Sequence, residues 1–401
     1  IHKKIKTLTG PPAYALSCSL KYVWNDKFVV CYTSGYNADD LNRRMNDCLD
    51  DMEDPVGAES DYSKYDGSQG KVWKILVKLL QATGFFLFAF GKEVGEYMYL
   101  KTYAVGKGFK YTVPFTMKSG SNITSVGNSA FNGLVWLYAL YLYCLWAMTN
   151  LDTLRMEKLY SIGYQSGTCM FVFILFKCPR WIIAYLTSGD DGFTLADDKY
   201  IDTGKFFEFF RSVAAALALV LKLKINRNLT ALDYLNMRFY YVDGKIRMGR
   251  KPGRGICKAG TILDRPLGKQ HTYFKRSEYE NHFFNILFSN LYAAIPCTNH
   301  VPFLGAYNRT LMEHLIERGI SPEECDDYVP LAEKRIQRYR YLAGEVYTAS
   351  SDTWEQFAEV YGLDQSDEED FITYFKKSLK LYGVTAVLEH RVIAELRDHE
   401  A

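Results

Sequence analysis

The sequence predicts an α+β fold from three observations. Two short runs of strand-forming residues, 181–187 and 192–196, flank a tight break at Gly189-Asp190-Asp191, and strands joined this closely form a β-hairpin. Residues 206–221 are apolar at helical spacing, which predicts a helix after the hairpin. From about residue 305 onward, helix start and stop signals recur, which predicts a helical C-terminal lobe.

The composition is that of an ordered globular protein of two or three lobes. The 401 residues are 48% hydrophobic and 23% charged, and the formal net charge is +2. Any nucleic-acid partner would therefore need a local positive field. The nine cysteines contain no CxxC pair, so we expect no zinc site or disulfide framework, and a reducing compartment fits best.

The elements before the hairpin are less regular. Residues 1–57 are expected to combine short apolar runs, turns at Gly10-Pro11-Pro12 and Ser34-Gly35, and a polar helix over 39–53. Because the chain lacks an initiator Met and a signal-peptide layout, we expect a piece of a longer polypeptide. Residues 131–148 are uncharged and approach the length of a membrane span, but a buried core helix satisfies the same pattern and is favoured.

Signals after the hairpin locate helix ends. Lys222 and Lys224 follow the predicted helix at 206–221, where cations suit a helix C-terminus. Capping boxes predict further helix starts at Thr310, Ser321 and Ser366. Glycines predict helix ends at Gly319, Gly362 and Gly383.

Two acidic motifs carry residue types suited to metal-dependent chemistry. Asp190 and Asp191, in TSGDDGF, lie side by side at the hairpin tip, where their repulsion favours a hard cation such as Mg²⁺ or Mn²⁺. Asp61 and Asp66 are five apart in DYSKYDG, and a strand that ends at Asp61 would let it face the hairpin carboxylates. Taken alone, both motifs also have plain explanations, since Asp and Gly are common turn residues and D-x₄-D arises by chance.

The third motif is KSGSNITSVGNSAFNG. Ser119-Gly120 opens a loop, and Thr124 and Asn128 share one face of the helix expected to follow. Small polar side chains on one face suit hydrogen bonds to a ribose 2′-hydroxyl. The alternative is an ordinary N-cap followed by a buried helix.

The order of the three motifs resembles motifs A, B and C of RNA-dependent RNA polymerases from positive-strand RNA viruses. The strings DYSKYDG and GDDGF resemble most closely the noda-like and tombus-like polymerases. The resemblance covers residues 61–191 and extends more weakly to about 258. It implies a right-hand polymerase fold: partial fingers at 1–57, a palm with an antiparallel sheet at 58–250, an interleaved fingers segment at about 70–115, and a mainly helical thumb at 251–401.

The resemblance also implies a reaction and its metal ligands. Asp61 and Asp190 would be the principal ligands of Mg²⁺ or Mn²⁺, with Asp191 supporting them. The implied activity is template-directed RNA synthesis, in which a two-metal mechanism transfers a nucleotide from a ribonucleoside triphosphate to an RNA 3′-hydroxyl.

Further roles follow from the same resemblance. Ribose selection would fall to Asp66 and Asn128, with Ser119, Gly120 and Thr124 nearby. Lys222 is the candidate general acid for the leaving pyrophosphate, with Lys224 as an alternative. The glycine usual just before this lysine is replaced by Val220, which weakens that assignment.

A basic segment follows the motifs. The string DYLNMRFYYVDGK resembles the family's hairpin beside the primer strand, and residues 238–258 hold seven basic residues against one acid. Phosphate and base-stacking contacts occur together in single-strand grooves, so RNA contact is favoured over a solvated loop. The candidate RNA-binding residues are Arg238, Lys245, Arg247, Arg250, Lys251 and Arg254.

Two departures and two alternatives stay open. The basic fingers motif that grips the triphosphate cannot be placed, and residues 149–176 look like an insertion. A reverse transcriptase would share the carboxylates but carry an aromatic residue blocking the sugar near Asp66. A non-catalytic RNA-binding or membrane-tethered replicase scaffold is the other class. Expected partners are an RNA template, the nascent strand, ribonucleoside triphosphates and upstream replicase parts, at membrane-associated replication complexes in the host cytoplasm without direct membrane insertion.

Overall fold

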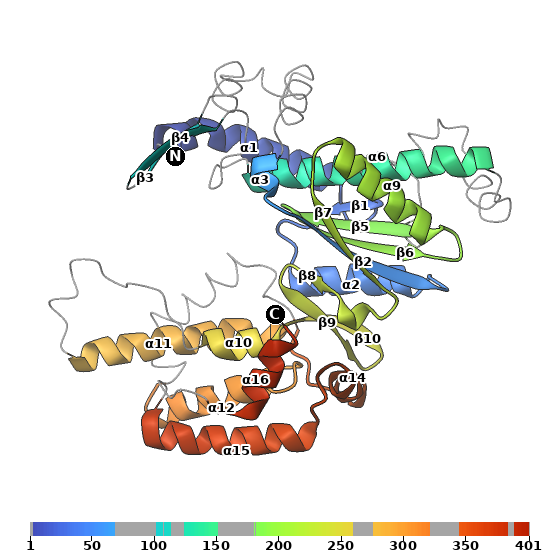
Figure 1. Ribbon diagram of the computed structural model, residues 1–401. Coiled ribbons are helices and arrows are strands. Elements are labelled where there is room, and N and C mark those ends of the chain that lie inside the picture. The colour runs from blue at the N-terminus through green and yellow to red at the C-terminus, as the bar shows by residue number, and fades with distance from the viewer. Residues whose placement is uncertain are drawn as a thin grey trace. The chain divides into compact units, whose positions relative to one another are not determined.

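The computed structural model describes residues 3–68, 102–106, 108–113, 124–150, 180, 182–259, 276–320, 345–383 and 389–400. It has the predicted α+β character, with helices and sheets throughout (Figure 1). The chain divides into two compact units: unit 1 comprises Ile1–Ser34 and Asp47–Leu235, and unit 2 comprises Gly35–Asn46 and Asn236–Ala401. The assignment of fingers, palm and thumb stays a prediction.

Unit 1 is built on a five-stranded sheet. Its order is β1 (Val30–Tyr32), β5 (Ile183–Ser188), β6 (Asp191–Asp197), β2 (Pro55–Tyr62) and β7 (Leu221–Asn226). β1 runs parallel to β5, and the other pairs are antiparallel. The predicted hairpin is confirmed as β5–β6, which Ser188 and Asp191 close as a pair. Gly189 occupies the turn with φ +70°, a conformation that glycine adopts without steric cost.

Two helices, α6 (Thr124–Asn150) and α9 (Thr203–Ala216), cover one face of this sheet (Figure 1). Alternate residues of β2, including Val56, Ala58 and Tyr62, join their apolar residues in one core. The intervening residues of β2, Glu59 and Asp61 among them, therefore point to the opposite face. This alternation decides which strand residues can form a polar site.

The apolar stretch at 131–148 lies in α6. This helix is long and apolar enough to cross a membrane, yet 67% of its most apolar part is buried inside unit 1. Trp136, on the face of α6 toward the sheet, is fully buried and stacks on Tyr185 of β5, with ring centroids 4.8 Å apart. This burial is the environment expected of a core helix.

The remaining elements of unit 1 are short, apart from the first helix. They are α1 (Lys3–Val23), α3 (Tyr65–Ser68), the β3 (Thr102–Gly106) and β4 (Phe109–Val113) hairpin, η1 (Leu229–Ala231) and β8 (Asp233–Tyr234). The turn predicted at Gly10-Pro11-Pro12 is wrong, because α1 runs through it. Ala13 and Leu16 of α1 are buried in the core, which favours a helical path there.

The helix predicted over 206–221 ends too late. α9 ends at Ala216, Ala218 turns the chain with φ +58°, and β7 begins at Leu221. Lys222 and Lys224 therefore lie on a strand, so their interpretation as cations at a helix C-terminus is wrong. In LKLKIN the first four residues alternate between half-buried and exposed, which is the period of an edge strand.

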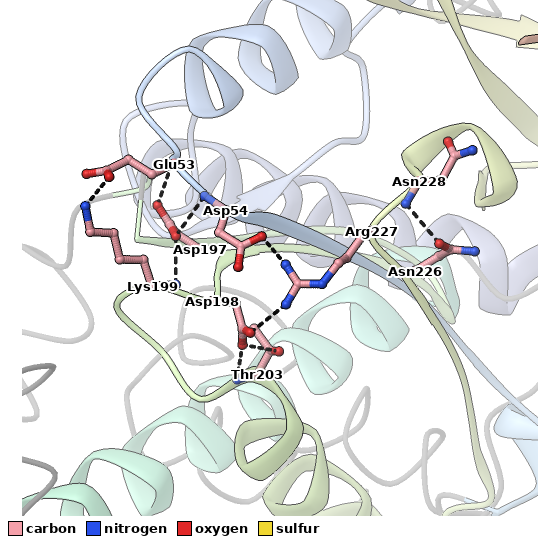
Figure 2. Close-up of polar contacts among 9 residues, drawn as sticks. All are labelled: Glu53, Asp54, Asp197, Asp198, Lys199, Thr203, Asn226, Arg227 and Asn228. Atoms are coloured by element: carbon pink, nitrogen blue, oxygen red, sulfur yellow. Dashed lines mark hydrogen bonds and ion pairs between the residues drawn. The ribbon is translucent and has the colours of Figure 1, made fainter.

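A polar network braces one end of β2, β6 and β7 (Figure 2). Asp197, whose side chain is fully buried, accepts hydrogen bonds from three backbone N–H groups of the neighbouring segments. Arg227 pairs with both Asp54 and Asp198. The network ties the strands together at the end opposite to Asp61.

Unit 2 combines a β-hairpin with helices. Its elements are most of α2 (Ala38–Leu49), β9 (Met237–Val242), β10 (Lys245–Arg250), α10 (Pro252–Ala259), α11 (Arg276–Ala294), η3 (Ile295–Cys297), α12 (Leu304–Glu317), α14 (Ser351–Tyr361), α15 (Gln365–Tyr382) and α16 (Arg391–Asp398). Asn42 and Asn46 of α2 accept hydrogen bonds from the backbone N–H groups of Met248 and Ile246. These bonds give partners to backbone N–H groups at the edge of β10 that does not pair with another strand.

The predicted helical C-terminal lobe is present in unit 2, but its start signals were misplaced. Gly319, Gly362 and Gly383 follow helices with positive φ, as predicted. Thr310 lies inside α12, and Ser366 is the second residue of α15, whose N-cap is Asp364. Ser321 lies outside the described residues.

Candidate active site

Three carboxylates lie at the end of unit 1 opposite to the braced one. The last pair of the β2–β6 ladder is Ser60 with Gly192, so the next register position places Asp61 opposite Asp191. Ser60 contacts the Tyr185 hydroxyl on the helix-covered face. Side chains alternate along strands, so Asp61 and Asp191 share the other face. Asp190 adjoins them in the hairpin turn.

Gly192 makes this approach possible. A Cβ at Gly192 would lie 2.0 Å from the Tyr185 hydroxyl and 2.4 Å from Ser60 Oγ. Only glycine therefore fits between these side chains, and the glycine of GDDG has a packing role. Its absence of a side chain lets β6 begin directly beside β2 and β5.

The negative charges of these carboxylates repel one another. Burial, together with the charges of Asp190, Asp61 and Glu59, raises the pKa of the Asp191 carboxyl to about 6. The pKa of Asp190 is also raised, first by burial and then by the charges of Asp61 and Asp66. A group of anions that disfavour one another in this way would be stabilised by a cation.

Carboxylate oxygens are the ligands that Mg²⁺ and Mn²⁺ prefer, so the donor chemistry fits these ions. Within the described residues, however, no group of three or more His, Cys, Asp or Glu side chains is arranged closely enough to hold a metal ion. Asp61 instead has a lysine as neighbour: Lys222 Nζ lies 3.4 Å from its Oδ2. A shared ion would require the three carboxylates to turn toward one another.

Lys222 reaches the carboxylates because β7 pairs with β2. Asp61 and Lys222 are directly opposite in the register, as are Glu59 and Lys224. The side chains of Asp61 and Lys222 are about half and two thirds exposed, so their ion pair contributes little stability. Of the two lysines considered from the sequence, Lys222 is the one paired with Asp61.

Asp66 and Asn128, predicted to act together, are in direct contact. Asn128 Nδ2 donates to Asp66 Oδ1 over 2.7 Å, joining α6 to α3. Thr124 lies one turn earlier, as the first residue of α6. Ser119 and Gly120 lie outside the described residues, so the loop of this motif is untested.

Two further residues of α6 hold the hairpin turn, and the sequence reading missed both. Ser129 Oγ accepts a hydrogen bond of 2.6 Å from the Gly189 N–H. Asn132 Nδ2 lies 3.3–3.4 Å from the carbonyl oxygens of Gly189, Asp190 and Asp191. The signal available was spacing, since Asn132 is four residues after Asn128 and so lies on the same helix face.

The basic residues predicted to contact RNA belong to unit 2, and they differ in exposure. Arg238 is 5% exposed, and its Nη1 donates to the Tyr361 hydroxyl over 2.6 Å. The guanidinium is therefore used inside unit 2, and RNA contact by Arg238 stays a prediction. Arg247 lies over the ring of Tyr347, with 4.0 Å to the centroid.

The remaining candidates are more accessible. Lys245 and Arg254 are exposed, and Arg254 also donates to Asn236 Oδ1 over 2.8 Å. Arg250 and Lys251 are half-buried. Contact of these four cations with RNA phosphates stays a prediction.

No protein-family model matches the sequence, and no curated protein matches it. Among solved structures, the RNA-dependent RNA polymerase of a human picobirnavirus is similar, with a TM-score of 0.49 and 14% identity over 78% of this chain and 53% of that chain. Its insertion loop deletion mutant gives a TM-score of 0.48 with the same identity and coverage. The chain thus spans about half the length of these polymerases. Neither structure supports the narrower likeness to noda-like and tombus-like polymerases.

Proposed function

We propose that the chain is the catalytic part of a viral RNA-dependent RNA polymerase, which adds ribonucleotides to an RNA strand on an RNA template. The observation that carries the proposal is the meeting of three distant motifs in unit 1. Asp61 lies near the end of β2 and Asp191 at the start of the adjacent β6, on the same face of the sheet, and Asp190 adjoins them. Asp66 is hydrogen-bonded to Asn128 and is close enough for its charge to raise the pKa of Asp190. Metal ligands and sugar contacts would need this proximity.

In this proposal Asp61, Asp190 and Asp191 hold Mg²⁺ or Mn²⁺. When bound, such ions lower the pKa of the attacking 3′-hydroxyl and neutralise charge on the triphosphate. The raised pKa values of Asp190 and Asp191 support the assignment, because these carboxylates lack sufficient compensating charge without a cation. Reorientation of Asp61 from Lys222 would accompany ion binding.

The protein's other residues position the substrate. Asp66 and Asn128 would accept and donate hydrogen bonds to the ribose hydroxyls. Lys222, freed from Asp61, would be close enough to the carboxylates to donate a proton to the leaving pyrophosphate. Lys245, Arg250, Lys251 and Arg254 would contact RNA phosphates.

The surroundings of Asp66, the proposed ribose contact, favour RNA synthesis over the DNA synthesis of a reverse transcriptase. The aromatic residue next to Asp66 is Tyr65, which is 2% exposed and stacks on Tyr62, with ring centroids 4.6 Å apart. Its hydroxyl donates to the Asn128 carbonyl. A ring held in the core in this way cannot block a ribose 2′-hydroxyl, so deoxynucleotide selection has no support from Tyr65.

A scaffold without catalysis is the other candidate, and the carboxylates argue against it. Keeping Asp190 and Asp191 beside Asp61 costs stability, and a protein that only bound RNA would gain nothing from acidic groups there. Association with upstream replicase parts, and location at membrane-associated replication complexes in the host cytoplasm, stay predictions.

The test is incorporation of ribonucleotides into a primed RNA template with Mg²⁺ or Mn²⁺ present. Asp190→Asn should abolish nucleotide addition while RNA affinity, measured by fluorescence anisotropy, stays nearly intact. The matched control is Asp370→Asn, the same chemical change at an exposed position of α15, which should keep full activity. Incorporation by Asp190→Asn at the normal rate, or equal loss of addition and RNA binding, would contradict the metal role. Retention of RNA without any incorporation by the unmodified chain would support the scaffold.

A further inference from the structure

Four backbone groups of the Gly189–Asp191 turn contact side chains of α6. Ser129 Oγ accepts a hydrogen bond from the Gly189 N–H, and Asn132 Nδ2 donates to three successive carbonyl oxygens. Each of the three Asn132 contacts is long, so the amide is shared among them. Both α6 side chains are fully buried, where water cannot replace these bonds.

The direction of the Asn132 amide is fixed from its other side. The Tyr185 hydroxyl donates to Asn132 Oδ1 over 2.7 Å, so the Nδ2 hydrogens must point toward the turn. Tyr185 is itself immobilised, with its ring stacked on Trp136 at an interplanar angle of 6°. Trp136 donates in turn to Thr194 of β6. The amide is therefore held between the sheet and the turn.

The orientation of a carboxylate follows from the peptide planes on either side of it. Three carbonyls held toward α6 fix the planes around Asp190 and Asp191, and strand alternation then directs the Asp191 side chain to the opposite face. Removing the amide would take this donor from the three carbonyls of the turn and allow these planes to rotate. The first consequence would be a loss of carboxylate alignment.

We propose that Asn132 is a positioning residue for the divalent-cation site, with Tyr185 fixing its orientation. Asn132 touches no substrate and acts through the backbone of the turn. The inference rests on the proposed function, because it assumes that Asp190 and Asp191 are cation ligands. Groups that orient metal ligands typically change metal affinity or activity 10–100-fold when they are replaced.

The decisive variant is Asn132→Asp, which keeps the size of the side chain and replaces the donor with an oxygen facing three carbonyls. We expect the Mg²⁺ concentration for half-maximal incorporation to rise about 10-fold or more, with RNA affinity unchanged. Tyr185→Phe keeps the ring and removes the bond to Oδ1, so it should raise the requirement by a smaller factor. Because Tyr185→Phe preserves packing, it also tests the proposal if Asn132→Asp does not fold.

A matched control separates positioning from general stability. Arg227→Met breaks the network at the far end of the same sheet and should lower the melting temperature without changing the Mg²⁺ requirement (Figure 2). An equal shift in Arg227→Met would overturn the inference, as would a requirement within twofold of normal in both Asn132→Asp and Tyr185→Phe. If the unmodified chain incorporates no nucleotide, the proposed function fails. Mn²⁺ titration followed by electron paramagnetic resonance would then still compare cation binding by the same variants.

Discussion

Asn128 Nδ2 lies 2.7 Å from Asp66 Oδ1, so the first turns of α6 are bonded to α3 directly after β2. The two residues are 62 positions apart in the sequence, and each belongs to a different motif. The amide holds the carboxylate in one direction and keeps a donor beside an acceptor. A ribose hydroxyl, which is both donor and acceptor, is matched by such a pair.

Asn128→Ala should therefore lower discrimination between ribo- and deoxynucleotides. Sites built to bond a substrate hydroxyl can reject analogues that lack it by 10⁴–10⁵-fold, and losing one of two partners should cost about 10-fold or more of this preference. The measurement is the ratio of kcat/KM for ATP and dATP. Asn226→Ala, which removes a turn bond at the far end of the sheet, should leave the ratio unchanged. An unchanged ratio in Asn128→Ala would exclude it from sugar selection.

Asp191→Asn should stabilise the metal-free protein at neutral pH. The folded-state pKa of Asp191 is about 6, above its ordinary value of 3.8, so the folded chain holds more protons than the unfolded chain between these values. The free energy of unfolding then falls as the pH rises through this window, by up to about 3 kcal/mol at 1.36 kcal/mol per pKa unit. Urea unfolding in EDTA should show the variant to be more stable at pH 8 and close to the unmodified chain at pH 4. A difference independent of pH would show that charge is not the cause.

His300→Leu should make unit 2 more resistant to acid. His300 is 1% exposed, and burial, with the nearby charge of Arg247, lowers its pKa from 6.5 to about 4. Between these values the unfolded chain binds a proton that the folded chain does not, so stability is lost as the pH falls through this window. The expected loss approaches about 3 kcal/mol and should be absent in the variant. The measurement is the denaturation midpoint of each chain at pH 7 and at pH 4.5. A loss of stability of equal size in both chains would show that His300 is not its cause.

The sequence predicts the hairpin and the carboxylates on it because their causes are local. Gly189 permits the turn, and the runs on both sides favour strands, so β5 and β6 follow from neighbouring residues. The pairing of Asp66 with Asn128 is not local, and only the resemblance to the polymerase motifs led us to expect the two residues to act together. The hairpin is the part of the site in which a short segment determines its own conformation.

What the sequence could not predict depends on distant partners. Arg238 looks like a solvated cation until Tyr361, 123 residues later, supplies its buried acceptor. Asn132 looks like an incidental polar residue in an apolar helix until the hairpin turn docks against it. The leucines of β7 suit both the helical and the strand period, and only the pairing of β7 with β2 decides between them.

One helix carries both Asn128 and Asn132, a single turn apart, so the proposed sugar contact and the proposed positioning of the cation site depend on the same helix. A slide of α6 by one residue, about 1.5 Å along its axis, would misalign the two together. A small molecule bound against this helix should therefore block the proposed activity without occupying the proposed nucleotide site. Escape by substitution would be difficult, because a change that restored one function would leave the other displaced.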